Sequence, residues 1–194
     1  MKPEITREFI SELKAIIEAK DDKAALNMMD DLHPADIAEI YEELNVDSAK
    51  YLYMLLDPEI ASDVLVELED DDRATLLKAL PPEEIASQFI NNMDSDDAAD
   101  VIADLGEDVK AEVLRLIEDV EQAGDIVDLL SYDEDTAGGL MAKELIRVNI
   151  NWSLSTCLRE MRKQAEDVDE IFYIYVVNDD NILKGIVSLK AMIM

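Results

Sequence analysis

The chain has little of what a disulfide-stabilised or nucleic-acid-binding protein needs. It contains one cysteine in 194 residues, which excludes an internal disulfide framework and a multi-cysteine metal site. Basic residues are scarce, because 17 Lys and Arg stand against 47 Asp and Glu and the formal net charge is −30. Since phosphate binding depends on Lys and Arg, this balance argues against nucleic acid as a partner and disfavours an anionic membrane surface.

Long hydrophobic runs are missing as well. The longest uninterrupted run, residues 171–177, is far shorter than the ~20 residues that cross a bilayer. The first ten residues, MKPEITREFI, lack the apolar core of a secretory signal. Apolar residues nevertheless make up 49% of the chain, so the composition predicts a packed core rather than disorder.

The negative charge is concentrated in the first part of the chain. Residues 1–144 carry a net charge of −29 and residues 145–194 carry −1, and the last fifty positions contain Trp152, Phe172, Tyr173 and Tyr175. This shift predicts an acidic helical domain over 1–131 and an α/β unit over 145–194. A turn-rich linker over 132–144 joins them.

Large apolar residues recur every twelve positions through the acidic part. The series is Leu32, Leu44, Leu56, Leu68, Leu80 and then, after one extra residue, Met93, Leu105 and Ile117, with Leu130 thirteen later. It defines nine blocks, from 21–32 to 118–130, most of which open with the Asp, Ser or Pro residues typical of helix N-termini. Because helices this short are marginal alone, we predict a superhelical solenoid of stacked short helices, capped by a longer helix over 5–20.

The last fifty residues have the pattern of an α/β unit. Strands are predicted over 145–149, 172–177 and 183–189, the second of them buried, with a helix over 155–164. A further helix begins near Leu189, where the chain stops, so we expect an incomplete module and a fragment of a longer protein. The predicted fold class is therefore mainly α, a solenoid of short helices followed by an incomplete α/β module.

One block carries carboxylates at the spacing of a cation-binding surface. Asp96, Asp100 and Asp104 are four residues apart, which places them on one helix face about 5–6 Å apart at Cβ. Asp63 and Glu67 repeat this spacing on an earlier block. Mg²⁺ suits such a surface, because it takes hard oxygen ligands, keeps most of its waters and needs only one or two carboxylates. The alternative is a solvated acidic face, and the residue types leave both open.

Residues 133–144 allow a second metal interpretation, a calcium loop. Asp133, Asp135, Gly138 and Glu144 fall at positions 1, 3, 6 and 12 of the EF-hand pattern. Position 5, however, is Ala137, and the following residues predict a strand instead of the exiting helix. The pair at 138–139 is better explained as a turn that lets backbone approach another group.

Neither the single histidine nor the single cysteine has the partners that catalysis requires. His33 precedes Pro34 at a predicted helix start, which suits a capping or surface role. Cys157 lies within a predicted helix and suits a core position. No constellation in the sequence supports an enzyme.

Three motifs occur together: His-Pro-Ala-Asp at 33–36, Tyr-Asp-Glu-Asp-Thr-Ala-Gly-Gly-Leu-Met at 132–141, and Ile-Tyr-Val-Val-Asn at 174–178 followed by Leu-Lys-Gly-Ile-Val-Ser-Leu at 183–189. With them the chain resembles the cytosolic part of MgtE-type magnesium transporters, from the N domain into the first cystathionine-β-synthase (CBS) domain. The resemblance implies that a second CBS domain and a membrane domain complete the full-length protein. It also implies a homodimer at the cytoplasmic face of the cell membrane, of which this fragment is a soluble piece.

The resemblance further implies a Mg²⁺ channel gated by cytosolic Mg²⁺, in which the acidic domain moves relative to the CBS domains. Matched motif by motif, the implied Mg²⁺ ligands are Asp63, Asp96, Asp100 and the backbone carbonyl of Gly139. A relative carries Glu at position 63, so Asp63 reaches one methylene less far. Mg²⁺ is the only cofactor implied, since one incomplete CBS module does not form a nucleotide cleft. The alternative function is an acidic helical-repeat module that binds a basic protein partner.

Overall fold

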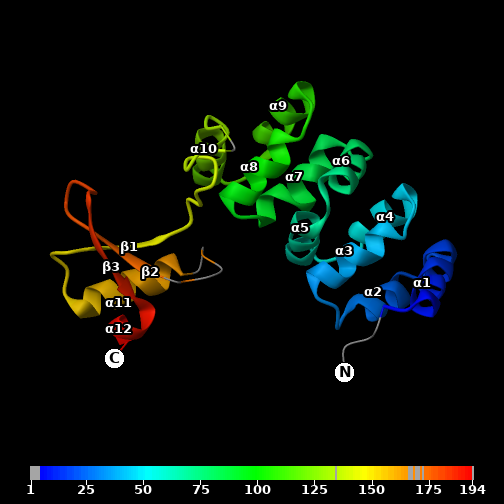
Figure 1. Cartoon of the computed structure of the whole chain (residues 1–194), viewed down its shortest axis with the longest axis horizontal. Coiled ribbons are helices and arrows are strands. Elements are labelled where there is room, and N and C mark those ends of the chain that lie inside the picture. Colours follow the sequence, from blue (N-terminus) through cyan, green and yellow to red (C-terminus); the bar gives the residue numbers. More distant parts are fainter. Residues whose placement is uncertain (1–4, 134, 166–167, 169–170, 172, 194) are drawn as a thin grey trace. The chain divides into compact units, whose positions relative to one another are not determined.

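The structure, a computed structural model, describes residues 5–133, 135–165, 168, 171 and 173–193. The chain divides into two compact units, Met1–Met141 and Ala142–Met194. The first is built from helices and the second from a three-stranded sheet with helices (Figure 1). The predicted fold class, mainly α with a solenoid of short helices followed by an α/β module, is confirmed. Within the described residues, no helix is both long enough and apolar enough to cross a bilayer.

Each predicted twelve-residue block contains one helix of the first unit, after the longer first helix. The elements are α1 (Arg7–Ala19), α2 (Asp22–Met29), α3 (Pro34–Glu42), α4 (Val46–Tyr53), α5 (Pro58–Glu67), α6 (Asp70–Lys78), α7 (Pro82–Gln88), the 3-10 turn η1 (Ile90–Asn92), α8 (Ser95–Ala103), α9 (Glu107–Leu116) and α10 (Val120–Leu129). The extra residue of the sixth block falls at η1, where the chain makes an additional turn before α8 begins.

Side chains at the block boundaries begin these helices, as the sequence predicts. Asp21 caps α2, because its Oδ1 accepts a hydrogen bond from the Ala24 N–H at 3.1 Å. His33 caps α3: its Nδ1 accepts from the Ala35 N–H at 3.4 Å, while its own N–H donates to Oδ2 of Asp36 at 3.2 Å. The capping role predicted for His33 is therefore confirmed.

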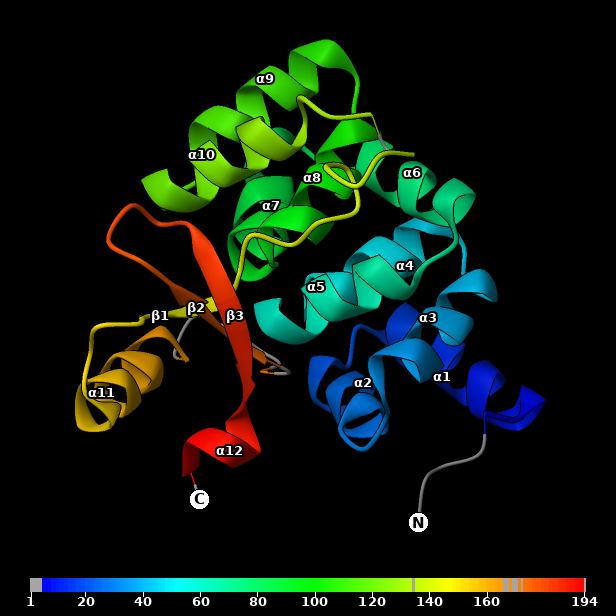
Figure 2. The same ribbon diagram turned by 60° about the vertical axis from the view of Figure 1, so that its left-hand side comes forward.

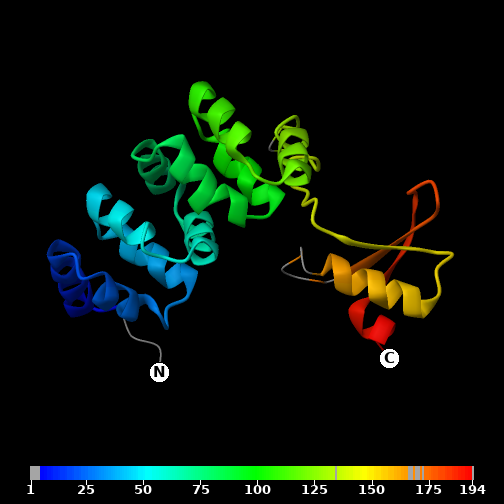
Figure 3. The ribbon, with the colours of Figure 1, turned by 180° about the vertical axis from the view of Figure 1, so that it is seen from behind.

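The helices stack mainly on the helix two positions along the chain. Thus α3 packs on α5, α5 on α7 and α7 on α9, while α4 packs on α6 and α8 on α10. Figures 1 and 3 show the helices of this unit following one another along a curved path. A single apolar core runs from Ile10 to Leu129, with Leu52, Ile85 and Ile126 among its fully buried members. Stacking thus buries the apolar face that each short helix would expose alone.

Two side-chain amides donate hydrogen bonds to backbone carbonyls near the ends of helices inside the array. The Nε2 of Gln88 donates to the carbonyl of Leu56 at 3.1 Å and to that of Tyr53 at 3.4 Å. The Nε2 of Gln122 donates to the carbonyl of Met93 at 2.8 Å. Leu56 and Met93 lie just beyond α4 and η1, where their carbonyls are outside the helical hydrogen-bond pattern. The two amides satisfy these carbonyls and tie distant blocks together.

The second unit contains a sheet with strand order β1-β2-β3, formed by β1 (Ile146–Asn149), β2 (Tyr173–Val177) and β3 (Leu183–Ser188). β1 pairs parallel with β2, and β2 pairs antiparallel with β3. Figure 2 shows the three strands with the crossover helix α11 (Leu154–Gln164) and the short α12 (Leu189–Ile193). Side chains of both helices and of the strands form one apolar cluster. Cys157 is part of this cluster, so its predicted core position is confirmed.

The sheet buries only one of its faces within this unit. Ile174 is fully buried, whereas Tyr173 is 51% exposed and Ile186, which pairs with Tyr175, is 55% exposed. The prediction of a buried strand over 172–177 is therefore wrong at Tyr173, while Tyr175, Val176 and Val177 are partly buried and Phe172 lies outside the described residues. The reason is that α11 and α12 both pack into the cluster on the Ile174 side.

Candidate cation site

An open pocket of about 560 Å³ lies within the helical unit, at α8, α9, the end of α10 and the turn that follows it. The spacing of its α8 residues at three, four and seven places them on one helix face. The lining residues are Asp96, Ala99, Asp100 and Ala103 of α8, Lys110 of α9, Leu129 and Leu130 of α10, and Tyr132, Asp133, Asp135, Thr136 and Gly139 of the turn. Four carboxylates and one ammonium therefore face a common space.

Thr136 organises the turn that closes the pocket. Its N–H and its Oγ1 both donate to the carbonyl of Asp133, at 2.9 and 2.7 Å. The same Oγ1 accepts from the Gly139 N–H at 3.3 Å, and the Thr136 carbonyl accepts from the Leu140 N–H at 3.1 Å. These local bonds place the carboxylates of Asp133 and Asp135 and the backbone of Gly139 in the pocket wall.

Gly138 gives the same turn room for an aromatic ring. A Cβ atom at this position would come closer than 3.0 Å to three ring atoms of Tyr132. The φ angle of Gly138 is not positive, so the backbone conformation is one that other residues adopt. Glycine is needed here for the close approach of the Tyr132 ring, which confirms the interpretation of the Gly-Gly pair as a turn that admits another group.

The row of carboxylates on α8 is divided between two roles. Asp96 and Asp100 line the pocket, but Asp104 does not. Instead, the Oδ2 of Asp104 lies 3.1 Å from the Nη2 of Arg73, which also lies 2.8 Å from the Oδ1 of Asp70. The predicted surface of three aligned carboxylates is therefore reduced to two, because the third forms an ion pair with α6.

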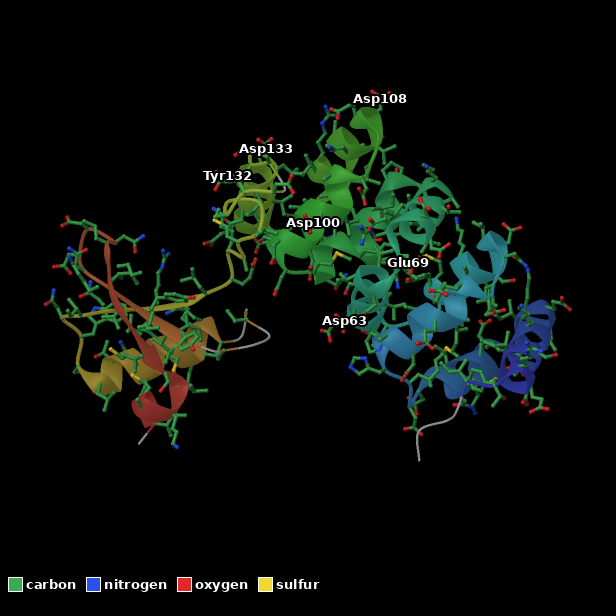
Figure 4. The ribbon with its side chains drawn as sticks, in the orientation of Figure 1. Asp63, Glu69, Asp100, Asp108, Tyr132 and Asp133 are labelled. Atoms are coloured by element: carbon green, nitrogen blue, oxygen red, sulfur yellow. The ribbon has the colours of Figure 1, made fainter. Side chains whose placement is uncertain are left out.

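The predicted ligands are only partly brought together. Asp96, Asp100 and Gly139 line one pocket, whereas Asp63 is exposed on α5 and is not among the lining residues. Figure 4 shows Asp63 well separated from Asp100 and Asp133.

Sequence reasoning did not join Asp133 and Asp135 to the α8 carboxylates. The sequence does mark both residues as candidate metal ligands, because they fit positions 1 and 3 of a calcium loop. The EF-hand interpretation does not hold, because the chain enters strand β1 two residues after Glu144 instead of a second helix.

The backbone adds to the negative potential of the pocket. Leu129 and Leu130 stand at the C-terminal end of α10, and Ala103 is the last residue of α8. Helix C-termini carry a partial negative charge from their carbonyl groups, so both ends favour a cation. Carboxylate and carbonyl oxygens are hard ligands, and the donor set of this pocket suits Mg²⁺ or Ca²⁺ rather than a softer metal.

Two family models match the chain. The model described as MgtE intracellular N domain matches residues 32–135, and the model described as CBS domain matches residues 137–194. The chain is 30% identical over 182 residues to the magnesium transporter MgtE of Thermus thermophilus, across 93% of this chain and 40% of that protein. It is 37% identical over 164 residues to the magnesium transporter MgtE of Enterococcus faecalis, across 84% of this chain and 36% of that protein. The chain thus spans about two fifths of the length of these curated relatives.

Two solved structures have the same fold. One is described as the cytosolic domain of the Mg²⁺ channel MgtE in complex with ATP; its TM-score is 0.85 at 29% identity, over 95% of this chain and 75% of that one. The other, described as the soluble part of a magnesium transporter, has a TM-score of 0.80 at 26% identity, over 96% of this chain and 73% of that one. The resemblance inferred from the three sequence motifs is therefore confirmed.

Proposed function

This chain belongs to the family of the MgtE intracellular N domain, and from that premise we propose that it is the cytosolic Mg²⁺-sensing part of a magnesium transporter. In this proposal the chain is a regulatory region and not an enzyme. Its acidic helical unit moves relative to the CBS domains as Mg²⁺ binds and dissociates, and this movement gates transport. The complete transporter is a homodimer, with a second CBS domain and a membrane domain as the partners of this region.

The observation that carries the proposal is the convergence of separate elements on one acidic pocket. Asp96 and Asp100 come from α8, Asp133 and Asp135 from the turn after α10, and Gly139 contributes backbone. Carboxylates held close together repel one another, and a divalent cation relieves that repulsion. Mg²⁺ keeps most of its waters and uses one or two carboxylates, which suits a roomy and open pocket.

Asp63 has a separate place in the proposal. It lies on α5, exposed and away from the pocket lining. We propose that Asp63 contacts Mg²⁺ separately from the carboxylates that line the pocket.

The first experiment compares two salts. A ligand that binds the native state alone stabilises it by mass action, so Mg²⁺ is expected to raise the melting temperature of the chain in a saturable manner. NaCl at matched ionic strength only screens the surface charges and is expected to do much less. Equal stabilisation by the two salts would show that the pocket has no specific affinity for Mg²⁺, and the proposal would fall.

A second candidate function rests on the acidic surface of the solenoid. Asp70, Asp71 and Asp72, for example, are all exposed at the start of α6. Such a surface could recruit a basic protein, as helical repeats present extended binding faces. A salt-sensitive complex that forms equally well with and without EDTA would favour this function over Mg²⁺ sensing.

A further inference from the structure

We propose that Lys110 is a tethered competitor for the cation in the acidic pocket and that its charge sets the divalent affinity. The inference rests on the proposed function, because it concerns how the same pocket is regulated. Lys110 carries the only positive charge among the lining side chains in the described part of the chain. Its ammonium group therefore balances part of the negative charge of the pocket carboxylates. Without it, a metal ion would have to balance that charge alone.

The position of the ammonium group supports this role. The Nζ of Lys110 donates to the carbonyl of Ala103 at 3.4 Å, at the C-terminal end of the helix that presents Asp96 and Asp100. A cation is favoured at such a helix end. Ala103 itself lines the pocket, so this hydrogen bond holds the ammonium at the pocket wall.

The alternative partner of Lys110 does not explain its placement. Its Nζ lies 3.8 Å from Oε1 of Glu107, whose side chain is 93% exposed, whereas the Lys110 side chain is 21% exposed. An ion pair with so exposed a carboxylate contributes little. The lysine is thus held at the Ala103 carbonyl, in the wall of the pocket that Asp96 and Asp100 also line.

The other basic residues of this region differ from Lys110 in their surroundings. Arg73 is engaged by Asp104 and Asp70, and Lys50 lies 3.2 Å from Oε2 of Glu84. A lysine ammonium is a compact charge on a flexible stem, so it can withdraw when a divalent ion enters. A bound divalent ion then replaces the ammonium group as the positive charge in the pocket. The free energy needed to displace the lysine weakens divalent binding.

The size of the effect follows from Coulomb's law. Removing one unit charge about 8 Å from a divalent ion in a water-like dielectric is expected to tighten binding about fivefold at low ionic strength, and less where salt screens the charges. An arginine at the same position keeps the charge, so it is expected to keep the affinity near that of the unaltered chain. These two expectations separate the charge of Lys110 from its packing.

Calorimetric titration with MgCl₂ at constant ionic strength tests the inference on the unaltered chain, Lys110→Gln, Lys110→Arg and Lys78→Gln. Lys78 is exposed on α6 and lies outside the pocket lining, so Lys78→Gln makes the same change in net charge elsewhere. At low ionic strength we expect about fivefold tighter binding for Lys110→Gln alone. Thermal unfolding without Mg²⁺ checks the fold, and Lys110→Met, which retains an apolar stem, replaces a Gln variant that does not fold.

The possible results separate this inference from the function on which it rests. Equal affinities in Lys110→Gln and Lys78→Gln would overturn the role of Lys110 and leave Mg²⁺ sensing intact. Tighter binding in Lys110→Arg as well would also overturn it, because the charge would then not be the cause. If no variant shows saturable Mg²⁺ binding, the proposed function fails and this inference fails with it.

Discussion

Arg73 of α6 and Asp104, the C-cap residue of α8, form an ion pair that joins two blocks of the solenoid. The Nη2 of Arg73 lies 3.1 Å from the Oδ2 of Asp104, and the Arg73 side chain is only 14% exposed. Asp100, one turn earlier on the same helix, lines the acidic pocket instead. Asp100 and Asp104 are four residues apart in the same row of carboxylates. Asp104 thus forms a structural contact, whereas Asp100 belongs to a candidate binding site.

Asparagine at position 104 and asparagine at position 100 are expected to change different properties of the chain. The first should change stability and the second the response to Mg²⁺. Asp104→Asn removes the charged partner of a largely buried guanidinium, so it should lower the free energy of unfolding by about 1 kcal/mol and leave the Mg²⁺ response unchanged. Asp100→Asn should reduce the Mg²⁺ response, because Asp100 lines the pocket. Urea denaturation of both variants with and without Mg²⁺ measures these effects. A Mg²⁺ response lost equally in the two variants would contradict the assignment.

Two glycines are expected to respond oppositely to alanine. At Gly138 a Cβ would overlap the ring of Tyr132, so Gly138→Ala should displace the ring and cost about 1–3 kcal/mol. Gly124 lies within α10 and a Cβ there meets nothing within 4 Å, so Gly124→Ala should stabilise by about 0.5–1 kcal/mol. Thermal unfolding of the two variants checks both signs. Equal and small shifts would mean that Tyr132 moves aside without cost.

The buried hydroxyl groups of Tyr41 and Tyr53 are expected to be dispensable for stability. Their ring centroids lie 4.1 Å apart, and within the described structure neither hydroxyl has a hydrogen-bond partner. A buried hydroxyl without a partner costs free energy, so Tyr41→Phe and Tyr53→Phe should be neutral or stabilise by about 1 kcal/mol. Chemical denaturation measures the change. A loss of about 1 kcal/mol or more would instead indicate an ordered water that bridges the hydroxyls.

The same residues predict how the chain responds to alkali. Burial raises the pKa of Tyr41 and Tyr53 well above 10.0, and a hydrogen bond to Asp22 raises the pKa of Tyr51 to about 12. A pKa raised in the folded state means that folding favours the neutral phenol. This stability is fully present below the unfolded pKa and is lost as pH rises through the folded pKa.

We therefore expect the free energy of unfolding to fall as pH rises above about 10, with phenolate absorbance appearing as the chain unfolds. The double variant Tyr41→Phe with Tyr53→Phe should lose less stability over the same pH interval. A pH profile identical to that of the unaltered chain would contradict the assignment to these two residues.

The amide of Gln88 is expected to matter more than its neighbouring hydroxyl. Gln88→Leu would remove the side-chain donor to the Leu56 carbonyl, while the Tyr53 carbonyl would keep its bond from the Leu56 N–H, and the loss should cost about 1–3 kcal/mol. Ser87→Ala, next to it, removes an exposed hydroxyl that bonds within its own helix and should change stability by about 0.5 kcal/mol or less. Melting temperatures of the two variants provide the comparison. A mild effect of Gln88→Leu would mean that water replaces the amide.

Much of the helical array could be read from the sequence, because its determinants are local. A twelve-residue period, caps such as Asp21 and His33, and apolar spacing of three and four act within one block. The βαββ order of the second unit follows from equally local alternation. Which strand faces are covered did not follow, since the exposure of Tyr173 depends on where α11 and α12 pack.

The sequence by itself determined the strong negative charge, its concentration in the helical part, the fold class and the family motifs. Only the tertiary structure decided which carboxylates meet. Asp96 and Asp100 share a pocket with Asp133, from a turn more than thirty residues later, while Asp104 turns to Arg73 and Asp63 stays apart on α5. The physical reason is that helix periodicity fixes a side chain's direction around its own axis. The neighbour it meets is fixed by the stacking of whole helices.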